Sequence, residues 1–214
     1  MTKNRWTGSF TGCLTMTLLF VAGVTSGAAQ TPPPPAPAGQ GRAGGRGGPA
    51  TPPLVMTTTA WEDGGVIPDK YTMAAGPSAV SPELKWSQVP AGTQSFVLLM
   101  HDPEPVLNKG SKMDITHWLI WNVPAVSTGL PEGVAQGELP DGSRQVSLRG
   151  NAYMGPGAGP GPYHHYTFEL YALDMKLDVP QGTPQQAADT RMAVVNAMDG
   201  HVLGKAVLVA RFHR

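Results

Sequence analysis

Three short motifs hold the side chains that could do chemistry, and each lies where a predicted strand meets a turn. The first is HDPEP, in which Asp102 and Glu104 follow an apolar run and alternate with prolines. The second is THW, where His117 begins another apolar run, and the third is HHY, which supplies His164 and Tyr166. If these strand ends converge, their imidazole and phenol groups would offer hydrogen-bond donors to an anion in a cleft.

Strand periodicity separates the two adjacent histidines of HHY. Side chains alternate along a strand, so His164 shares a face with Tyr166 and Phe168, while His165 faces the other way. Only His164 is therefore expected at the cleft, with His165 at the surface or on the opposite sheet face.

The same periodicity places His117 on one face with Leu119 and Trp121. A histidine beside so much apolar surface is more often a hydrogen-bonded structural residue than a functional one, and both interpretations stay open.

The motif content argues against several kinds of chemistry. Two histidines and a carboxylate could bind a metal, but the chain has no H-x-H or H-x-x-x-H pair, so no metal site is predicted. It also has no G-x-S-x-G, P-loop or dinucleotide fingerprint, so neither a cofactor nor enzyme activity is expected. A hydrolase that uses an acid–histidine pair as a general base is the weaker alternative.

The elements that must position these motifs are mostly strands. Apolar or alternating runs bounded by turn residues predict strands at 54–61, 95–102, 116–123, 144–148, 165–174 and 206–212. The run at 95–102 is apolar on both parities, which is typical of a central strand covered on both faces. Many strands with long Gly/Pro loops predict a mainly β fold, a sandwich or barrel.

One late helix completes the prediction. Thr183 can cap it, Pro184 suits its first turn and Gly200 suits its end. Its expected apolar stripe consists of Ala188, Met192, Val195 and Met198.

Composition divides the chain into three parts. Residues 1–29 have a basic start, an apolar run of about a dozen residues and small residues before Gln30, which predicts a signal peptide, with an uncleaved anchor as the alternative. Residues 30–53 are Pro/Gly-rich and predict a disordered linker, and 54–214 form the folded domain. The expected location is periplasmic or secreted, with no stable membrane span after cleavage.

The domain carries 11 Lys and Arg against 15 Asp and Glu, a net charge of −4, which argues against a nucleic-acid partner.

The chain resembles bacterial members of the phosphatidylethanolamine-binding protein family, the group that includes the Raf kinase inhibitor proteins. The resemblance extends over most of the domain and is carried by the order and spacing of several segments. They are DGGVIPDKYT (63–72), SPELKWSQVPAGTQSFVLLMHDPEP (81–105), HWLIWNVPA (117–125), LPEG (130–133), the GP…HHYTFELYALD run and GHVLGKAVLVARF (200–212).

This resemblance implies a Greek-key β-sandwich with a few short peripheral helices and a small pocket at one edge. In the family the pocket binds phosphate-like anions, including the phosphoethanolamine head group. Matching motif by motif, the resemblance assigns ligand binding to Asp102, Pro103, His117, Gly155, Pro156, His164 and Tyr166. Two departures bear on the pocket's shape: D-P-E-P has Glu104 in place of an aspartate and one residue fewer before its last proline, and GPGAGPGP replaces a tighter loop. A third, His165 in place of an arginine, removes a fixed charge but leaves the pocket donors.

The function expected from these residues and this resemblance is that of an exported, non-enzymatic binding protein for phosphate or a phospholipid-head-group-like anion. Its affinity is expected to rise as pH falls through the imidazole range, near roughly pH 6–7. The alternative is an interaction protein that inhibits a protease, as some relatives do.

Overall fold

A computed structural model describes residues 53–107, 109–110 and 114–214. The expected signal peptide and nearly all of the expected linker lie outside these residues. The strands are β1 (Val55–Thr57), β2 (Gly65–Val66), β3 (Leu84–Ser87), β4 (Ser95–Asp102), β5 (Ile115–Pro124), β6 (Gly129–Leu130), β7 (Arg144–Val146), β8 (His164–Leu173) and β9 (Val202–Phe212). The helices are the 3₁₀ turns η1 (Asp69–Tyr71), η2 (Met73–Ser78), η3 (Glu104–Leu107) and η4 (Pro184–Gln186), and α1 (Ala187–Ala197).

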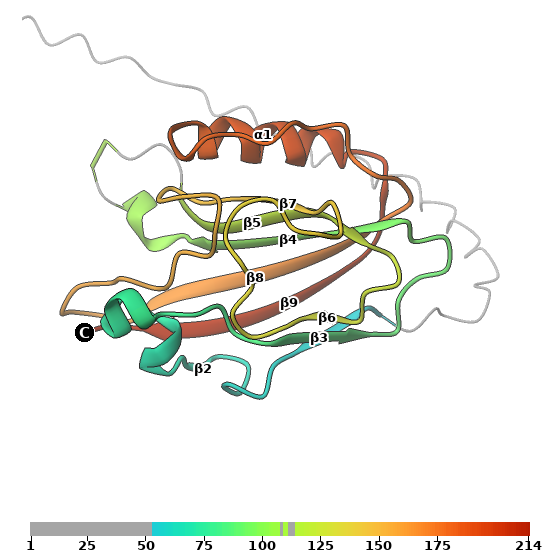
Figure 1. Ribbon diagram of the computed structural model, residues 1–214. Helices are drawn as coiled ribbons and strands as arrows, with labels where there is room; N and C mark the ends of the chain where they lie inside the picture. The colour runs from blue at the N-terminus through green and yellow to red at the C-terminus, as the bar shows by residue number, and fades with distance from the viewer. Residues whose placement is uncertain (1–52, 108, 111–113) are drawn as a thin grey trace, which may run out of the picture. The chain divides into compact units, whose positions relative to one another are not determined.

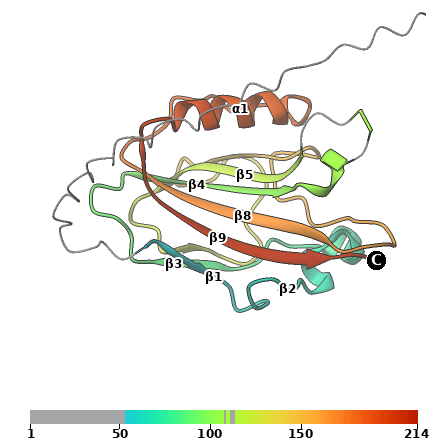
Figure 2. The ribbon, with the colours of Figure 1, turned by 180° about the vertical axis from the view of Figure 1, so that it is seen from behind.

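The strands of the described residues form two sheets. A six-stranded sheet has the order β2-β9-β8-β4-β5-β7, and a three-stranded sheet has the order β1-β3-β6. Figure 1 shows α1 on one side of the large sheet and the small sheet on the other. The reverse view agrees and places the C-terminus beside the 3₁₀ turns that follow β2 (Figure 2). The predicted mainly β fold, two packed sheets with few short helices, is confirmed.

Strand β4 is the centre of the molecule because both of its faces are buried. Phe96, Leu98 and Met100 pack into the core between the two sheets, whereas Val97 and Leu99 pack into the core beneath α1. Burial on both faces explains why this strand reads as a continuous apolar run. Its predicted bounds, 95–102, are those observed.

A β-bulge near the start of β5 overturns one prediction. Met100 pairs with Trp118 but the next residue, His101, pairs with Thr116, so His117 is the extra residue of the bulge. The bulge breaks the alternation of side chains, and the His117 ring packs edge-to-face on Tyr166, with 5.0 Å between the ring centroids. Because Tyr166 belongs to the core between the sheets, His117 does not share the face of Leu119, as simple alternation predicted.

The late helix exists, but its predicted apolar stripe is wrong in phase. Thr183 caps the turn η4 with Gln186 in a capping box, and the α-helix begins only at Ala187. The side chains that this helical segment buries are those of Ala187, Thr190, Val194 and Met198. Met192 and Val195 are instead 53% and 41% exposed. Ala187 and Val194 each precede a predicted stripe residue by one position, about 100° around an α-helix, so the segment has apolar residues on two faces and tertiary packing decides which face is buried. Among the helices of the described ranges, none is long and apolar enough to cross a membrane.

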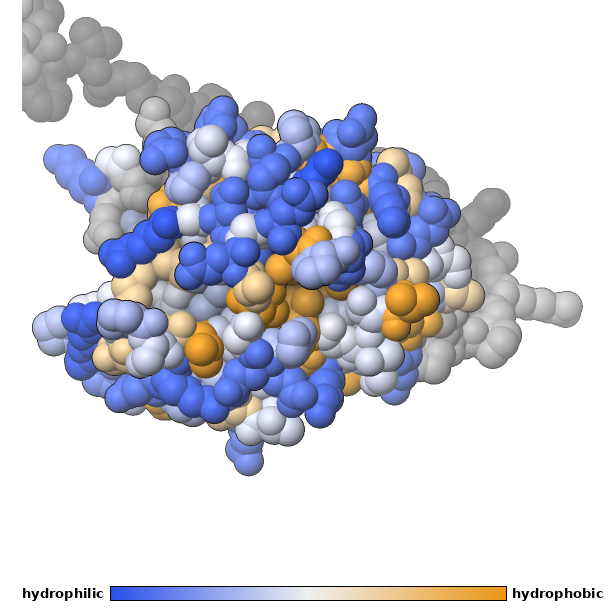
Figure 3. Space-filling model, viewed as in Figure 1, coloured by the Kyte–Doolittle hydropathy of each residue, from blue (hydrophilic) through white to orange (hydrophobic). Residues whose placement is uncertain are grey.

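Hydrophobic side chains are also exposed on one face of the molecule. Figure 3 shows a mainly hydrophilic surface with hydrophobic residues gathered near its middle. Exposed apolar side chains are common on folded domains and assign no function by themselves.

Candidate functional site

A cavity of about 430 Å³ opens at the edge of the large sheet where β4 ends and β8 begins. Its position follows from the topology, because antiparallel pairing of β4 with β8 brings Asp102 and His164 to the same end of the sheet. The lining residues are Met73, Asp102, Pro105, Ile115, His117, Leu148, Arg149, Met154, Gly157, Ala158, Gly159, His164 and Tyr166. Four residues that sequence reasoning assigned to the pocket therefore meet in one cavity: Asp102, His117, His164 and Tyr166.

Asp102 is the last residue of β4 and is only 3% exposed. One carboxylate oxygen lies 2.8 Å from Nδ1 of His164, and the other accepts a hydrogen bond of 3.1 Å from the backbone N–H of Glu104. Burial raises the pKa of Asp102, although the hydrogen bond with His164 acts in the opposite direction. The folded protein therefore holds this carboxylate in an environment that disfavours its negative charge.

His117 is a buried, neutral imidazole at neutral pH. Its Nδ1 donates a hydrogen bond of 2.9 Å to the carbonyl oxygen of Met154. Burial lowers the pKa of His117 to about 4, and hydrogen bonds to backbone carbonyls offset only part of this effect. The expectation that protonation near pH 6–7 raises anion affinity therefore does not hold for His117.

The hydroxyl of Tyr166 is held by the glycine-rich loop. Its oxygen accepts hydrogen bonds from the backbone N–H groups of Gly157 and Ala158, at 3.3 and 3.2 Å. Burial raises the pKa of this phenol, so it keeps its proton. The carboxylate of Asp102 also acts on this hydroxyl, since its charge and hydrogen bonding further raise the pKa of Tyr166.

The start of the loop needs glycine for a packing reason. A Cβ on Gly155 would lie 2.8 Å from the carbonyl oxygen of Tyr71 and 2.9 Å from Cα of Thr72, both closer than contact allows. The backbone N–H of Met73 also donates a hydrogen bond of 2.8 Å to Pro156. The predicted wall residues Gly155 and Pro156 thus dock the loop on the turns η1 and η2, and the next three residues line the cavity. Pro103 follows the cavity residue Asp102 in the sequence but does not itself line the cavity. Pro105 does line it.

Arg149 is a cavity residue to which sequence reasoning assigned no role. Among the described residues that line the cavity, it alone carries a permanent positive charge. The only signal for it was its position, directly after the predicted strand at 144–148. A lone arginine after a strand is commonplace, so its convergence on the cavity could not be predicted from the sequence.

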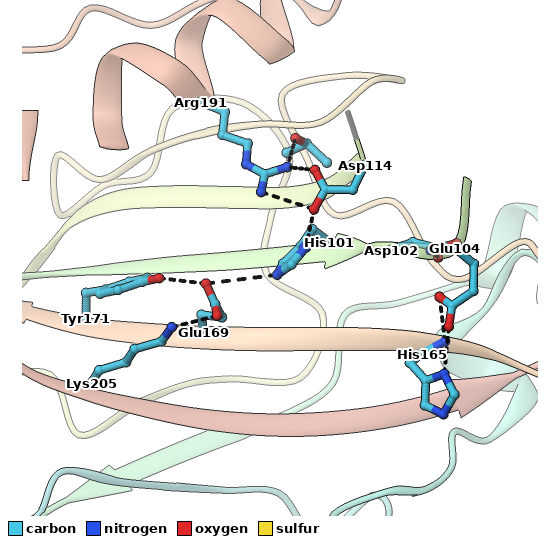
Figure 4. A network of polar contacts seen from close by, with 10 residues as sticks. His101, Asp102, Glu104, Asp114, His165, Glu169, Tyr171, Arg191 and Lys205 are labelled. Carbon is cyan, nitrogen blue, oxygen red and sulfur yellow. Dashed lines mark hydrogen bonds and ion pairs between the residues drawn. The ribbon is translucent and has the colours of Figure 1, made fainter. Parts of the chain in front are cut away.

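His165 lies outside the cavity and contacts Glu104 twice. Its Nδ1 is 2.6 Å from one oxygen of Glu104, and its backbone N–H donates a hydrogen bond of 3.0 Å to the other. Figure 4 shows Glu104 reaching across to His165 at the end of the sheet. Glu104 and His165, which both differ from the family pattern, therefore contact each other directly.

A second cluster of charged residues lies on the opposite face of the large sheet, beneath α1. Nδ1 of His101 is 2.5 Å from Asp114, which also binds the guanidinium of Arg191 from α1. Glu169 is 2.7 Å from Nζ of Lys205 and accepts a hydrogen bond of 2.6 Å from the hydroxyl of Tyr171. Figure 4 shows this cluster linking α1 to β4, β8 and β9.

The fold and site together define a small β-sandwich with a cavity, lined by both polar and apolar side chains, at one edge of its larger sheet. The family model described as phosphatidylethanolamine-binding protein matches residues 57–213. The chain belongs to the phosphatidylethanolamine-binding protein family.

Two curated relatives illustrate the sequence similarity. The chain is 40% identical over 162 residues to a UPF0098 protein of Methanothermobacter thermautotrophicus, covering 74% of this chain and 98% of the relative. It is 34% identical over 128 residues to the UPF0098 protein YbhB of Escherichia coli, covering 56% of this chain and 78% of the relative.

Solved structures agree on the fold. A phosphatidylethanolamine-binding protein homologue of Chlamydia trachomatis superposes with a TM-score of 0.62 at 30% identity, covering 76% of this chain and 98% of that one. YbcL of Escherichia coli superposes with a TM-score of 0.60 at 24% identity, covering 75% and 98%.

Proposed function

We propose that this protein is an exported, non-enzymatic binding protein whose cavity takes a small phosphate-like anion, either free or as the head group of a phospholipid. The observation that carries the proposal is the cavity itself. Arg149, the Asp102–His164 pair and the hydroxyl of Tyr166 all border one space of about 430 Å³. That volume suits a small ligand, since pockets for drug-sized molecules run from about 300 to 1,000 Å³.

The charge balance of the cavity supports an anion. Asp102 is paired with the imidazole of His164 at 2.8 Å, so its carboxylate already has a hydrogen-bond partner inside the protein. Arg149 places a permanent positive charge at the same cavity, and the hydroxyl of Tyr166 also borders it. A phosphate group accepts hydrogen bonds from both, and arginine is well suited to it because its planar fork of N–H donors matches the phosphate oxygens.

The same cavity supports binding in preference to turnover. Within the described part of the chain, its lining includes no serine, threonine, cysteine or lysine. Those are the side chains that most often form covalent intermediates. The buried Asp102 and neutral His117 are held by hydrogen bonds to the protein, which suits a rigid binding site.

Export is the part of the proposal that rests on residues 1–29. Their basic start, apolar run and small residues before Gln30 are typical of a cleaved signal peptide. The mass of the mature protein recovered from the periplasm or medium of its host would test this directly. Recovery of the full-length chain from the cytoplasm alone would contradict export.

The binding proposal is tested by calorimetric titration of the full chain with inorganic phosphate and, separately, with phosphoethanolamine, both in the presence of a metal chelator. We expect saturable one-to-one binding that weakens about tenfold in Arg149→Gln, the equivalent of about 1.4 kcal/mol. Lys85→Gln is the matched control, because it removes one positive charge from a side chain on β3 that does not line the cavity. Absence of binding at millimolar ligand, or equal effects of the two substitutions, would refute the proposal.

A further inference from the structure

Two carboxylates and an imidazole meet where β4 ends and β8 begins. Asp102, Glu104 and His164 each offer one donor atom, and these three atoms all lie within 4.8 Å of one another. The two carboxylates and the histidine come from different strand ends, and the antiparallel pairing of β4 with β8 brings them together. No short histidine spacing in the sequence signals this arrangement, because His164 lies 62 positions after Asp102.

Their spacing is close to what a metal ion requires. A transition metal binds nitrogen and oxygen donors at about 2.0–2.2 Å, which places neighbouring donors about 3–4 Å apart. The contact between His164 and Asp102 is already 2.8 Å. Glu104, in the 3₁₀ turn η3, has the longest of the three side chains and needs the only adjustment.

The local charges also favour a cation. Asp102 is 3% exposed, and a carboxylate oxygen of Glu104 lies within 4.8 Å of its own donor atom. Two neighbouring carboxylates with so little solvent are costly to keep ionised unless positive charge compensates them. Among the described residues, neither carboxylate forms an ion pair with a lysine or an arginine.

We propose that Asp102, Glu104 and His164 bind a divalent transition-metal ion of the Zn²⁺ type at the edge of the cavity. One imidazole nitrogen with two carboxylate oxygens suits such an ion, whereas Mg²⁺ and Ca²⁺ prefer oxygen donors alone. Three protein donors leave a coordination position open, as in zinc sites that accept an exogenous ligand. Since Asp102 and His164 line the cavity, this open position faces the space where an anion would bind.

In this arrangement His165 is a positioning residue. It holds both oxygens of Glu104, one through Nδ1 at 2.6 Å and one through its backbone N–H at 3.0 Å (Figure 4). A carboxylate oxygen has a second lone pair, so Glu104 can keep these contacts while it binds a metal. Hydrogen-bonded partners of this kind orient metal ligands and typically change metal affinity by about 10–100-fold.

This inference goes beyond the proposed function and does not depend on it. Metal binding is measured by titrating the chelator-treated full chain with Zn²⁺ in a buffer free of phosphate. We expect one site per chain, with affinity reduced at least about tenfold in Glu104→Gln and in His164→Gln, and by about 10–100-fold in His165→Ala.

The chain contains a matched control for this experiment. His201 and Asp174 form a histidine–carboxylate pair with the same Nδ1-to-oxygen distance of 2.8 Å, and both side chains are more than 40% exposed. No third donor joins this pair among the described residues. His201→Gln should therefore leave Zn²⁺ affinity unchanged.

Several outcomes would overturn the proposal. They are the absence of saturable Zn²⁺ binding, an equal loss in His201→Gln and Glu104→Gln, or tighter binding of Mg²⁺ or Ca²⁺ than of Zn²⁺. If His164→Gln is unstable, Glu104→Gln decides, because Glu104 lies outside the hydrophobic core. Phosphate binding in chelator without Zn²⁺ binding would refute only the metal site, and the reverse result would refute only the anion site.

Discussion

Neighbouring residues of β4, His101 and Asp102, point to opposite faces of the same sheet, and each belongs to a histidine–carboxylate pair. Beneath α1, His101 contacts Asp114, and Asp114 also binds the guanidinium of Arg191. At the cavity, Asp102 contacts His164 and has no arginine or lysine partner among the described residues. The residue types are the same, but only the pair beneath α1 is neutralised by a fixed positive charge.

The two aspartates respond to these surroundings in opposite ways. Burial raises the pKa of Asp114, but hydrogen bonds from His101 and Arg191 outweigh it and hold that pKa well below the usual range. At Asp102 burial prevails and the pKa is raised. The fold therefore stabilises the ionised form of Asp114 and destabilises the ionised form of Asp102. A destabilised polar group that borders a cavity is typical of a binding site, where function opposes stability.

The largest effect on stability is expected from Asp114→Asn. The substitution leaves Arg191, whose side chain is 16% exposed, without its carboxylate, and breaking such a pair costs about 3 kcal/mol. Urea unfolding at pH 7 measures this loss, and phosphate binding by the folded variant should be unchanged. A loss below about 1 kcal/mol would show that the network beneath α1 does not stabilise the fold.

The same pair predicts a pH dependence. Since the pKa of Asp114 is depressed by folding, its contribution is fully present above the unfolded value of about 4 and is lost as pH falls toward the lower folded value. Asp114→Asn should therefore lose less stability than the wild type below pH 4.

The second effect on stability comes from His117 at the cavity and is expected only at mildly acidic pH. Folding lowers the pKa of His117 from 6.5 to about 4, so the unfolded chain binds a proton that the folded chain excludes. Stability should fall by about 3 kcal/mol between pH 7 and pH 4 because of this residue alone. His117→Asn retains a side-chain N–H for the carbonyl of Met154 but cannot titrate.

Urea unfolding of the wild type and His117→Asn at pH 7 and pH 4.5 separates this contribution. The wild type should lose more stability than the variant over that interval. Parallel losses in both proteins would mean that His117 is not buried as the structure places it.

A third substitution should change binding without changing stability. Arg149→Met removes the positive charge at the cavity, and no hydrogen bond or ion pair of Arg149's guanidinium occurs among the described residues. The free energy of unfolding should stay within about 0.5 kcal/mol of the wild type. Phosphate affinity should fall about tenfold. A variant that is destabilised but still binds phosphate with wild-type affinity would show that Arg149 stabilises the fold and does not bind the anion.

The sharpest contrast with Asp114→Asn is expected from Asp102→Asn. Because the fold disfavours the ionised carboxylate, the amide should leave stability unchanged or raise it by less than about 1 kcal/mol. Zn²⁺ affinity should nevertheless fall at least tenfold, roughly 1.4 kcal/mol of binding free energy. If Asp102→Asn is as destabilising as Asp114→Asn, the two faces of the sheet do not differ as described.

Several features of the site could be predicted because they depend on local pattern. The bounds of β4 follow from an apolar run that ends at Asp102, and the alternation of β8 puts His164 and Tyr166 on one face. The place of His117 at the cavity followed from the family resemblance. Its direction could not be predicted, because the bulge that turns its ring toward Tyr166 depends on the pairing with β4.

Contacts between distant segments account for the rest. The contact between Glu104 and His165 joins residues 61 positions apart, and the convergence of Arg149 on the cavity depends on how the segment after β7 packs. The buried face of α1 likewise depends on its packing against the large sheet, where Ala187, Val194 and Met198 join the core.

The sequence by itself determined five strands of the large sheet, the alternation of side chains along β8, and the residue types at the strand ends, but it did not predict β2, β3 or β6. These properties are local, since hydrophobic periodicity and turn residues act over a few positions. The tertiary structure alone decided that the carboxylate of Asp102 is buried without a fixed cation while that of Asp114, twelve positions later, binds Arg191. That difference arises from desolvation and long-range pairing, which no local pattern of residues encodes.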